Sequence, residues 1–234
     1  METFEKYARQ IALAGFGEVG QKLLADSSVV VVGAGGVGSG ALPLLAASGI
    51  GRIALVDCDV VSLSNLHRQT LYDAAQVGQS KARAAAARLS ALNPDCEISF
   101  FDEQFGVCGK FESLIERADL CIDATDSFAS RTAVSEVCSR VGRLEILASA
   151  GGYVSQMMVL GGGFYFDKYV GADSTAASEK SRGLPIFPAA AHLSGVWAAG
   201  AAIAHLAGVS PLEAGVFRIF DFRTGVLRKF NLLA

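Results

Sequence analysis

Residues 27–40, SSVVVVGAGGVGSG, limit what this 234-residue chain can fold into more than any other stretch. Four consecutive valines are typical of a strand buried on both faces, as in a parallel sheet covered by helices. The glycines that follow predict a tight turn into a helix from about Val37 to Ser48, which ends at Gly49. The stretch therefore predicts an α/β fold whose first unit is a strand, a glycine turn and a helix.

The same turn is suited to holding a phosphate. Glycine permits the bend, lets backbone N–H groups approach an anion and allows the helix to pack closely on the strand, with the helix N-terminus facing the negative charge. We predict that nucleotide phosphates bind at the four glycines Gly33, Gly35, Gly36 and Gly38. Dinucleotide enzymes, nucleotide-activating enzymes and some proteins without a ligand share such turns, so this motif alone does not choose among them.

Composition and charge exclude several classes of partner. The chain is 51% hydrophobic, and its net charge of -3 comes with scattered Lys and Arg residues rather than a basic stripe, so we predict no nucleic-acid partner. The most apolar stretch, 189–209, is rich in alanine and glycine and contains His192 and His205. We interpret it as a buried helix and predict no membrane partner. The N-terminus lacks the apolar core of a signal peptide, which predicts a cytoplasmic protein.

The five cysteines are odd in number and include no CxxC pair, which argues against a disulfide framework and a four-thiolate zinc site. Cys58, Cys121 and Cys138 have apolar neighbours in the sequence and are predicted to be small core residues, whereas Cys108 is predicted to lie in a loop.

Strands and helices alternate as far as residue 149 and then the pattern changes. We predict further strands at 52–56, 97–101, 120–124 and 144–149, and helices at 80–92, 110–117 and 127–141. Later strands at 153–160, 216–220 and 226–230 have no short helices between them, which predicts antiparallel pairing. We therefore expect one domain over 1–234, with a Rossmann-like, mostly parallel sheet flanked by helices and an antiparallel C-terminal extension. Within it we expect an N-terminal arm over 1–26 and a mobile crossover loop over 167–191.

Polar residues gather after the second strand. Asp57 stands at its carboxyl end, nineteen positions after Gly38, where a carboxylate can accept both ribose hydroxyls; the alternative is an Asp that caps the loop. The segment that follows is expected to face the nucleotide with Asp59, Asn65, His67, Arg68 and Gln69. Arg68 suits a phosphate, and Asn65 suits a phosphate or the attacking group. His67 is interpreted as a packed or surface histidine.

Further candidates lie at the start of a helix and at the end of the fourth strand. Lys81 lies in the first turn of the 80–92 helix, where the helix dipole does not favour a cation, so we expect an anion nearby; the alternative is a solvated helix lysine. Asp123 and Asp126 stand at the carboxyl end of the fourth strand, and two carboxylates there fit Mg²⁺ held between protein and phosphate oxygens. Asp126 also precedes a helix, so an N-cap role is an alternative to metal binding.

Arg9, taken alone, is interpreted as a surface cation.

Together these motifs resemble a known family. The blocks YARQ, GAGGVG, DCDVVSLSNLHRQTLY, VGQSKA and DATDSFASR, over about residues 7–149, are similar to the bacterial E1-like adenylyltransferases of the MoeB, ThiF and HesA group. The resemblance implies that ATP and Mg²⁺ are used to adenylate the C-terminal Gly carboxylate of a ubiquitin-like sulfur-carrier protein, with release of pyrophosphate. It also implies a homodimer in which Arg9 reaches the ATP of the neighbouring subunit.

The resemblance assigns roles to individual side chains. Asp57 would hold the ribose, and the glycines of the turn would cradle the phosphates. Asn65, Arg68 and Lys81 would stabilise negative charge on the transferring phosphate. Asp126 would bind Mg²⁺.

The chain departs from the family pattern in two places. The paired CxxC zinc ligands are missing, so we predict no structural zinc. The 167–191 loop contains no cysteine, whereas many relatives place there a cysteine used in thioester or persulfide chemistry, so the sequence does not support a covalent sulfur step.

Two other interpretations stay open. The glycine turn with Asp57 also suits an NAD-dependent oxidoreductase, although that activity gives Arg68, Lys81 and Asp126 no shared purpose and lacks an obvious proton donor. The missing cysteine and zinc ligands also suit a nucleotide-binding scaffold that has lost catalysis.

Overall fold

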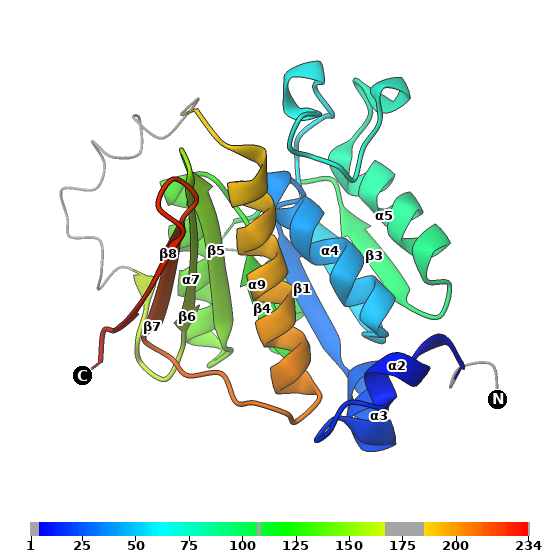
Figure 1. Cartoon of the computed structure of the whole chain (residues 1–234). Coiled ribbons are helices and arrows are strands. Elements are labelled where there is room, and N and C mark those ends of the chain that lie inside the picture. Colours follow the sequence, from blue (N-terminus) through cyan, green and yellow to red (C-terminus); the bar gives the residue numbers. More distant parts are fainter. Residues whose placement is uncertain (1–4, 107–108, 167–184, 234) are drawn as a thin grey trace.

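One mixed sheet of eight strands organises the domain (Figure 1). The computed structural model describes residues 5–106, 109–166 and 185–233. The strand order is β3-β2-β1-β4-β5-β6-β7-β8. Five strands are parallel: β1 Ser28–Val32, β2 Arg52–Val56, β3 Glu97–Phe101, β4 Leu120–Asp123 and β5 Glu145–Gly151. Three continue the sheet in antiparallel fashion: β6 Val154–Leu160, β7 Val216–Asp221 and β8 Val226–Asn231. The predicted fold class is confirmed.

The valine strand β1 lies inside the sheet, between β2 and β4. All five of its residues are buried, and it pairs in parallel with both neighbours. The chain runs outward from β1 through β2 to β3, and then returns to β4 on the other side of β1. The carboxyl ends of β1 and β4 therefore form a topological switch point, which is where open α/β sheets bind ligands.

Helices cover both faces of the sheet, as Figure 1 shows. One face carries α4 Gly36–Ser48, α5 Lys81–Leu92 and α9 Pro188–Leu206; the other carries α6 Gly109–Glu116 and α7 Phe128–Arg140. The helices α4 and α9 cross very closely because glycines meet there. A Cβ atom built on Gly195 would lie 2.0 Å from the Val37 carbonyl oxygen, and one on Gly40 would lie 2.5 Å from that of His192. Only glycine allows this approach.

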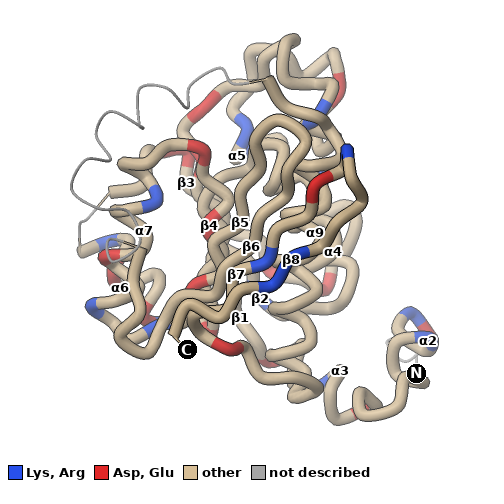
Figure 2. The backbone as a smooth tube through the Cα atoms, turned by 60° about the vertical axis from the view of Figure 1, so that its left-hand side comes forward, with Lys and Arg blue, Asp and Glu red and all other residues tan. Residues whose placement is uncertain are grey.

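Among the described helices, α9 alone is long and apolar enough to cross a membrane by length and composition. It packs against α4 and against β5 and β6, which is the environment of a core helix. Figure 2 shows the charged positions along the chain, with basic residues on the neighbouring strands β7 and β8.

The N-terminal arm is anchored at the amino ends of the strands. It contains the short helix α2 Ala8–Ile11 and the helix α3 Gly17–Asp26. Gln10 and Gln21 both donate to the Ser48 carbonyl at the end of α4, and the buried Asn93 donates to the Tyr7 hydroxyl. These bonds hold the arm at the edge of the sheet opposite the glycine turn (Figure 1).

The structure differs from the sequence predictions at one cysteine and at the end of the crossover loop. Cys121 and Cys138 are buried as predicted, but Cys58 is exposed, because the chain has already left β2 at that residue. Cys108 and residues 167–184 of the predicted crossover loop lie outside the described residues. The C-terminal end of that loop was predicted too late, since α9 already begins at Pro188.

Candidate functional site

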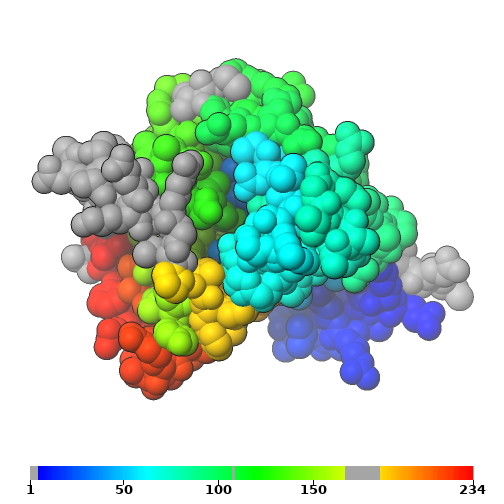
Figure 3. Space-filling model, turned by 90° about the horizontal axis from the view of Figure 1, so that it is seen from above, coloured from blue at the N-terminus to red at the C-terminus, as the bar shows by residue number. Residues whose placement is uncertain are grey.

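Three segments leave the sheet at one edge: the glycine turn after β1, residues 57–80 after β2, and residues 124–127 after β4. Figure 3 looks down on this edge and shows a hollow between cyan and green parts of the chain, with blue atoms at its floor. Apart from Arg9, and from Asp123 at the end of β4, the predicted site residues belong to these segments or to the first turn of α5.

The glycine turn packs directly against the segment after β4. Gly33 has a φ of 98°, which favours glycine, and a Cβ on it would lie 2.7 Å from the Ala124 carbonyl oxygen. A Cβ on Gly38 would lie 2.4 Å from the Gly33 carbonyl oxygen. The turn is therefore as tight as a phosphate-binding turn requires, and it holds residues 124–127 at its side.

Asp57 ties the turn to β2. One carboxylate oxygen accepts from the Ala34 N–H at 2.7 Å and the other accepts from the Asp59 N–H at 2.8 Å. Desolvation raises the pKa of Asp57 above its ordinary value, although the Lys81 charge and the two N–H donors oppose the shift. Each oxygen keeps a lone pair, so the carboxylate remains able to accept a ribose hydroxyl.

Arg68 and Gln69 lie beside the turn. A Cβ on Gly36 would be 3.4 Å from the Arg68 Cγ, and a Cβ on Gly35 would be 3.4 Å from the Gln69 side-chain nitrogen. The Arg68 guanidinium donates to the Asn65 side-chain oxygen at 2.9 Å. Gln69 is buried, and its side-chain oxygen has no hydrogen-bond partner among the described residues. His67, by contrast, is exposed, as its predicted surface position requires.

Lys81 is buried rather than solvated. Its side chain is 4% exposed, and its ammonium donates to the Asp59 carboxylate at 2.8 Å. The Asp59 side chain is 67% exposed. The Tyr72 hydroxyl donates to the Ala34 carbonyl at 2.8 Å and also lies 3.4 Å from the Lys81 carbonyl oxygen, which links α5 to the glycine turn. The anion expected near Lys81 is thus present as Asp59, in a pair that opens toward solvent.

The aspartate that ends β4, Asp123, and the aspartate after the strand, Asp126, have different surroundings. Asp123 is fully buried; one oxygen accepts from the Thr125 N–H at 2.8 Å, and the other has no partner among the described residues. Desolvation raises the pKa of Asp123, and the positive charge of Arg131 opposes this. Asp126 is exposed. The exposed Asp126 is therefore the more accessible member of the predicted pair of Mg²⁺ ligands, and the role of Asp123 stays a prediction.

Asp126 does not cap α7, so that alternative is wrong. The N-cap is Ser127, whose hydroxyl accepts from the Ser130 N–H at 3.0 Å. Within the described part of the chain, no group of three or more metal-ligating side chains occurs. Magnesium is often held by one carboxylate together with substrate phosphates and waters. The exposed Asp126, which follows the segment packed against the glycine turn, fits that donor set.

Two side chains that the sequence did not single out shape the site. Arg131 on α7 donates to the Thr125 carbonyl through Nε at 3.3 Å and Nη2 at 3.1 Å, which fixes the segment before Asp126. His192 on α9 lies with Nε2 3.0 Å from the Arg68 carbonyl oxygen. Arg131 is part of the DATDSFASR block, so the motif contained a signal for it; nothing near His192 in the sequence indicates its contact.

The structure does not bring Arg9 to this edge. Arg9 is exposed on α2, which lies at the amino ends of the strands, opposite the glycine turn (Figure 1). Within one chain it does not join the other predicted residues.

The chain is similar to known proteins over almost its whole length. The model of the ThiF family matches residues 7–233. A probable molybdopterin-synthase adenylyltransferase of Porphyra purpurea is 38% identical over 71% of this chain and 44% of its own length. The sulfur carrier protein ThiS adenylyltransferase of Escherichia coli K12 is 32% identical over 98% of this chain and 91% of its own length.

Several other relatives are considerably longer than this chain. The chain spans only 37% of the length of the adenylyltransferase and sulfurtransferase UBA4 of Candida glabrata, to which it is 38% identical. Among solved structures, E. coli MccB shares the fold with a TM-score of 0.84 at 22% identity, over 97% of this chain and 70% of MccB. The structure of PaaA gives a TM-score of 0.82 at 23% identity, over 99% of this chain and 74% of PaaA.

Proposed function

The chain belongs to the ThiF family, and from that premise we propose that it uses ATP and Mg²⁺ to adenylate the C-terminal Gly carboxylate of a ubiquitin-like sulfur-carrier protein. One observation carries the proposal. A tight glycine turn at a topological switch point is flanked by the Arg68 segment, by the first turn of α5 with Lys81, and by the segment that ends in Asp126. This set suits a triphosphate with its metal.

In the proposed reaction, a carboxylate oxygen of the carrier attacks the α-phosphorus of ATP. The bond from that phosphorus to the bridging oxygen of the β-phosphate breaks, and pyrophosphate leaves with the electron pair. The products are an acyl-adenylate and pyrophosphate. Little covalent chemistry is asked of the protein beyond alignment and neutralisation of phosphate charge.

The side chains have distinct roles in this proposal. Backbone N–H groups of the glycine turn hold the phosphates, and Asp57 accepts from the ribose. Arg68 and Lys81 neutralise negative charge, while Asn65 orients the Arg68 guanidinium through its 2.9 Å hydrogen bond. Asp126 holds Mg²⁺, which supplies additional positive charge to the phosphate oxygens when bound.

The curated names of two relatives support the class of partner, since one acts on the sulfur carrier protein ThiS and the other on molybdopterin synthase. Arg68 lies beside the turn through its Cγ and carbonyl oxygen, and the Lys81 ammonium is buried against Asp59. These cations support phosphate binding, which an enzyme and an inactive scaffold share, so the exchange assay separates the two.

The test is carrier-dependent exchange of labelled pyrophosphate into ATP with Mg²⁺. Arg68→Ala and Asp126→Ala are expected to reduce exchange by about a hundredfold or more, as is typical when a group that stabilises transition-state charge is removed. Arg88→Ala and Asp26→Ala are matched controls, because both are exposed and lie on other segments. Unchanged exchange in both site variants contradicts the catalytic assignment. NADH formation without exchange indicates an oxidoreductase instead.

We further propose that the enzyme acts as a homodimer in which Arg9 serves the partner's site, because its position excludes a role in its own subunit's site. Arg9→Ala and Asp126→Ala are each expected to abolish exchange. Mixed heterodimers of the two variants are expected to regain up to one working site per dimer. Absence of activity in verified heterodimers argues against action across the interface.

A further inference from the structure

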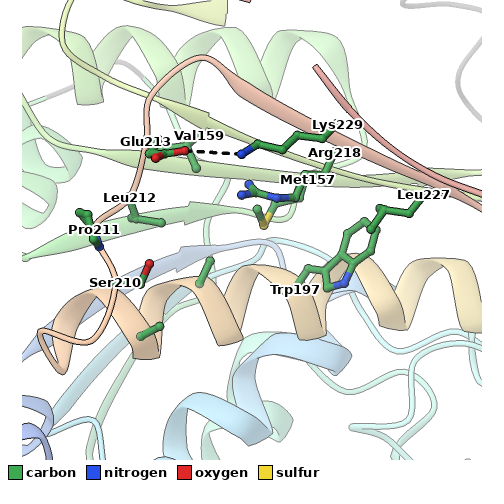
Figure 4. Close-up of a pocket in the computed structure, with 12 residues that line it drawn as sticks. Met157, Val159, Trp197, Ser210, Pro211, Leu212, Glu213, Arg218, Leu227 and Lys229 are labelled. Atoms are coloured by element: carbon green, nitrogen blue, oxygen red, sulfur yellow. Dashed lines mark ion pairs between the residues drawn. The ribbon is translucent and has the colours of Figure 1, made fainter. Parts of the chain in front are cut away.

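A cavity of about 580 Å³ lies between the C-terminal half of α9 and the sheet, away from the glycine turn (Figure 4). Its floor is formed by Met157 and Val159 of β6, and its wall by Trp197 of α9. The chain from Ser210 to Glu213, which connects α9 to β7, closes one end (Figure 4). None of the residues assigned to the nucleotide site contributes to it, so it is a separate site.

The cavity exists because α9 presents small side chains to this part of the sheet. Ala201 and Ala204 line the helix side, and each extends only to a Cβ atom. Trp197 is held by an edge-on contact with Phe220, with ring centroids 6.4 Å apart and planes at 81°. The indole therefore borders the space without filling it. Such a volume is in the range of small-molecule sites in proteins.

The charges around the cavity are unbalanced. Lys229 and Glu213 form an ion pair at 3.7 Å, and Figure 4 shows this pair across the cavity from Trp197. Arg218 of β7 also lines the cavity, and its guanidinium has neither an ion-pair partner nor a hydrogen bond among the described residues. The lining thus has one guanidinium without a partner next to an apolar wall. The guanidinium nitrogens are open to water, so the charge needs no partner for stability, but its unpaired donors can bind an anion that enters the cavity.

We propose that this cavity binds a small amphiphilic carboxylate. The carboxylate pairs with the Arg218 guanidinium, whose planar set of donors matches two carboxylate oxygens. The aliphatic body lies against Met157, Val159 and Trp197. A neutral ligand of the same length leaves the guanidinium unpaired, and a cationic one is repelled by it. The proposal does not depend on adenylation.

Trp197 gives a direct readout, because it is the single tryptophan of the chain. Decanoate, 1-decanol and decylammonium are titrated below their micellar concentrations while the tryptophan emission is recorded. Decanoate is expected to change the emission in a saturable way and to bind about tenfold or more tightly than the alcohol, because it alone pairs with the charge. Decylammonium is expected not to bind. Equal responses to the three compounds, or no saturable response, overturn the proposal.

Three variants locate the binding. Arg218→Gln is expected to weaken decanoate binding by about tenfold or more, whereas Arg228→Gln leaves it unchanged. Arg228 is the matched control, since Leu227 and Lys229 line the cavity and the residue between them faces the other side of β8. Ala204→Leu is expected to fill the cavity and abolish binding. Thermal unfolding of each variant verifies that it folds.

The proposal is also overturned if decanoate binds Arg218→Gln as it binds the parent chain. An emission that changes with protein concentration but not with decanoate shows that a second copy occupies the cavity, and this result likewise overturns it.

Discussion

Glu145 offers the sharpest test of the electrostatics of this fold. It begins β5 and is 1% exposed, and neither carboxylate oxygen has a hydrogen-bond partner among the described residues. Burial raises its pKa well above the ordinary value of 4.5, and the neighbouring Cys138 and Asp123 raise it further. The folded protein therefore keeps Glu145 protonated at pH values where the unfolded chain ionises it.

This difference makes stability depend on pH with a definite sign. Below pH 4.5 the carboxyl is protonated in both states, and its contribution to stability is fully present. Above pH 4.5 the unfolded state loses the proton and the folded state retains it, so the free energy of unfolding falls by about 1.4 kcal/mol per pH unit until the pH passes the folded pKa. Glu145→Gln keeps the shape of the side chain and removes the titration.

We expect the melting temperatures of the parent chain and Glu145→Gln to separate as pH rises. For a domain of this size, each pH unit within the window corresponds to about 3–5 °C in favour of the variant. Thermal unfolding is followed by circular dichroism from pH 4 to pH 8. Glu97→Gln is the control, because Glu97 is exposed on β3 and its curve is expected to parallel that of the parent chain. Parallel curves for Glu145→Gln and the parent chain refute the reasoning.

Three further substitutions test the glycine turn, the buried lysine and the hydrogen bonds that hold the N-terminal arm. Gly38→Ala places a Cβ 2.4 Å from the carbonyl oxygen of Gly33, so we expect calorimetric titration to show no ATP binding. Lys81→Met is expected to reduce pyrophosphate exchange by about a hundredfold or more and to change the melting temperature little, because the released Asp59 is 67% exposed. Asn93→Ala removes buried hydrogen bonds to the N-terminal arm and to α4, and we expect urea unfolding to show a loss of about 2–3 kcal/mol.

Much of the fold was predictable because it rests on local pattern. The valine run of β1 is buried on both sides, and the change at residue 150 marks the point where pairing becomes antiparallel. The surroundings of Asp123 and Asp126 were harder to predict. Asp123 is still part of the strand, paired in register with Val32 and Leu147, so it is buried, whereas Asp126 lies beyond the sheet. A sequence shows that a strand ends, but an error of one or two residues decides whether a carboxylate faces solvent.

Contacts between distant segments were not predictable from the chain alone. His192 lies within hydrogen-bond distance of the Arg68 carbonyl oxygen from a helix 124 positions away. Its place depends on how closely α4 and α9 cross, which the glycines at that crossing decide. Hydrophobic periodicity identifies a buried helix face, yet it does not indicate which neighbour covers that face.

Lys81 pairs with the acidic Asp59 at the edge of the sheet where we propose that phosphates bind. The lysine stem is buried in α5, so its position is set by packing, while the carboxylate that meets it is largely exposed. Asp59 is largely exposed, so its carboxylate stays hydrated when it leaves the pair, but the buried Lys81 ammonium then needs another anion as its partner. In the proposed reaction, a triphosphate would bring several negative charges to the same place and replace Asp59 as the partner of Lys81.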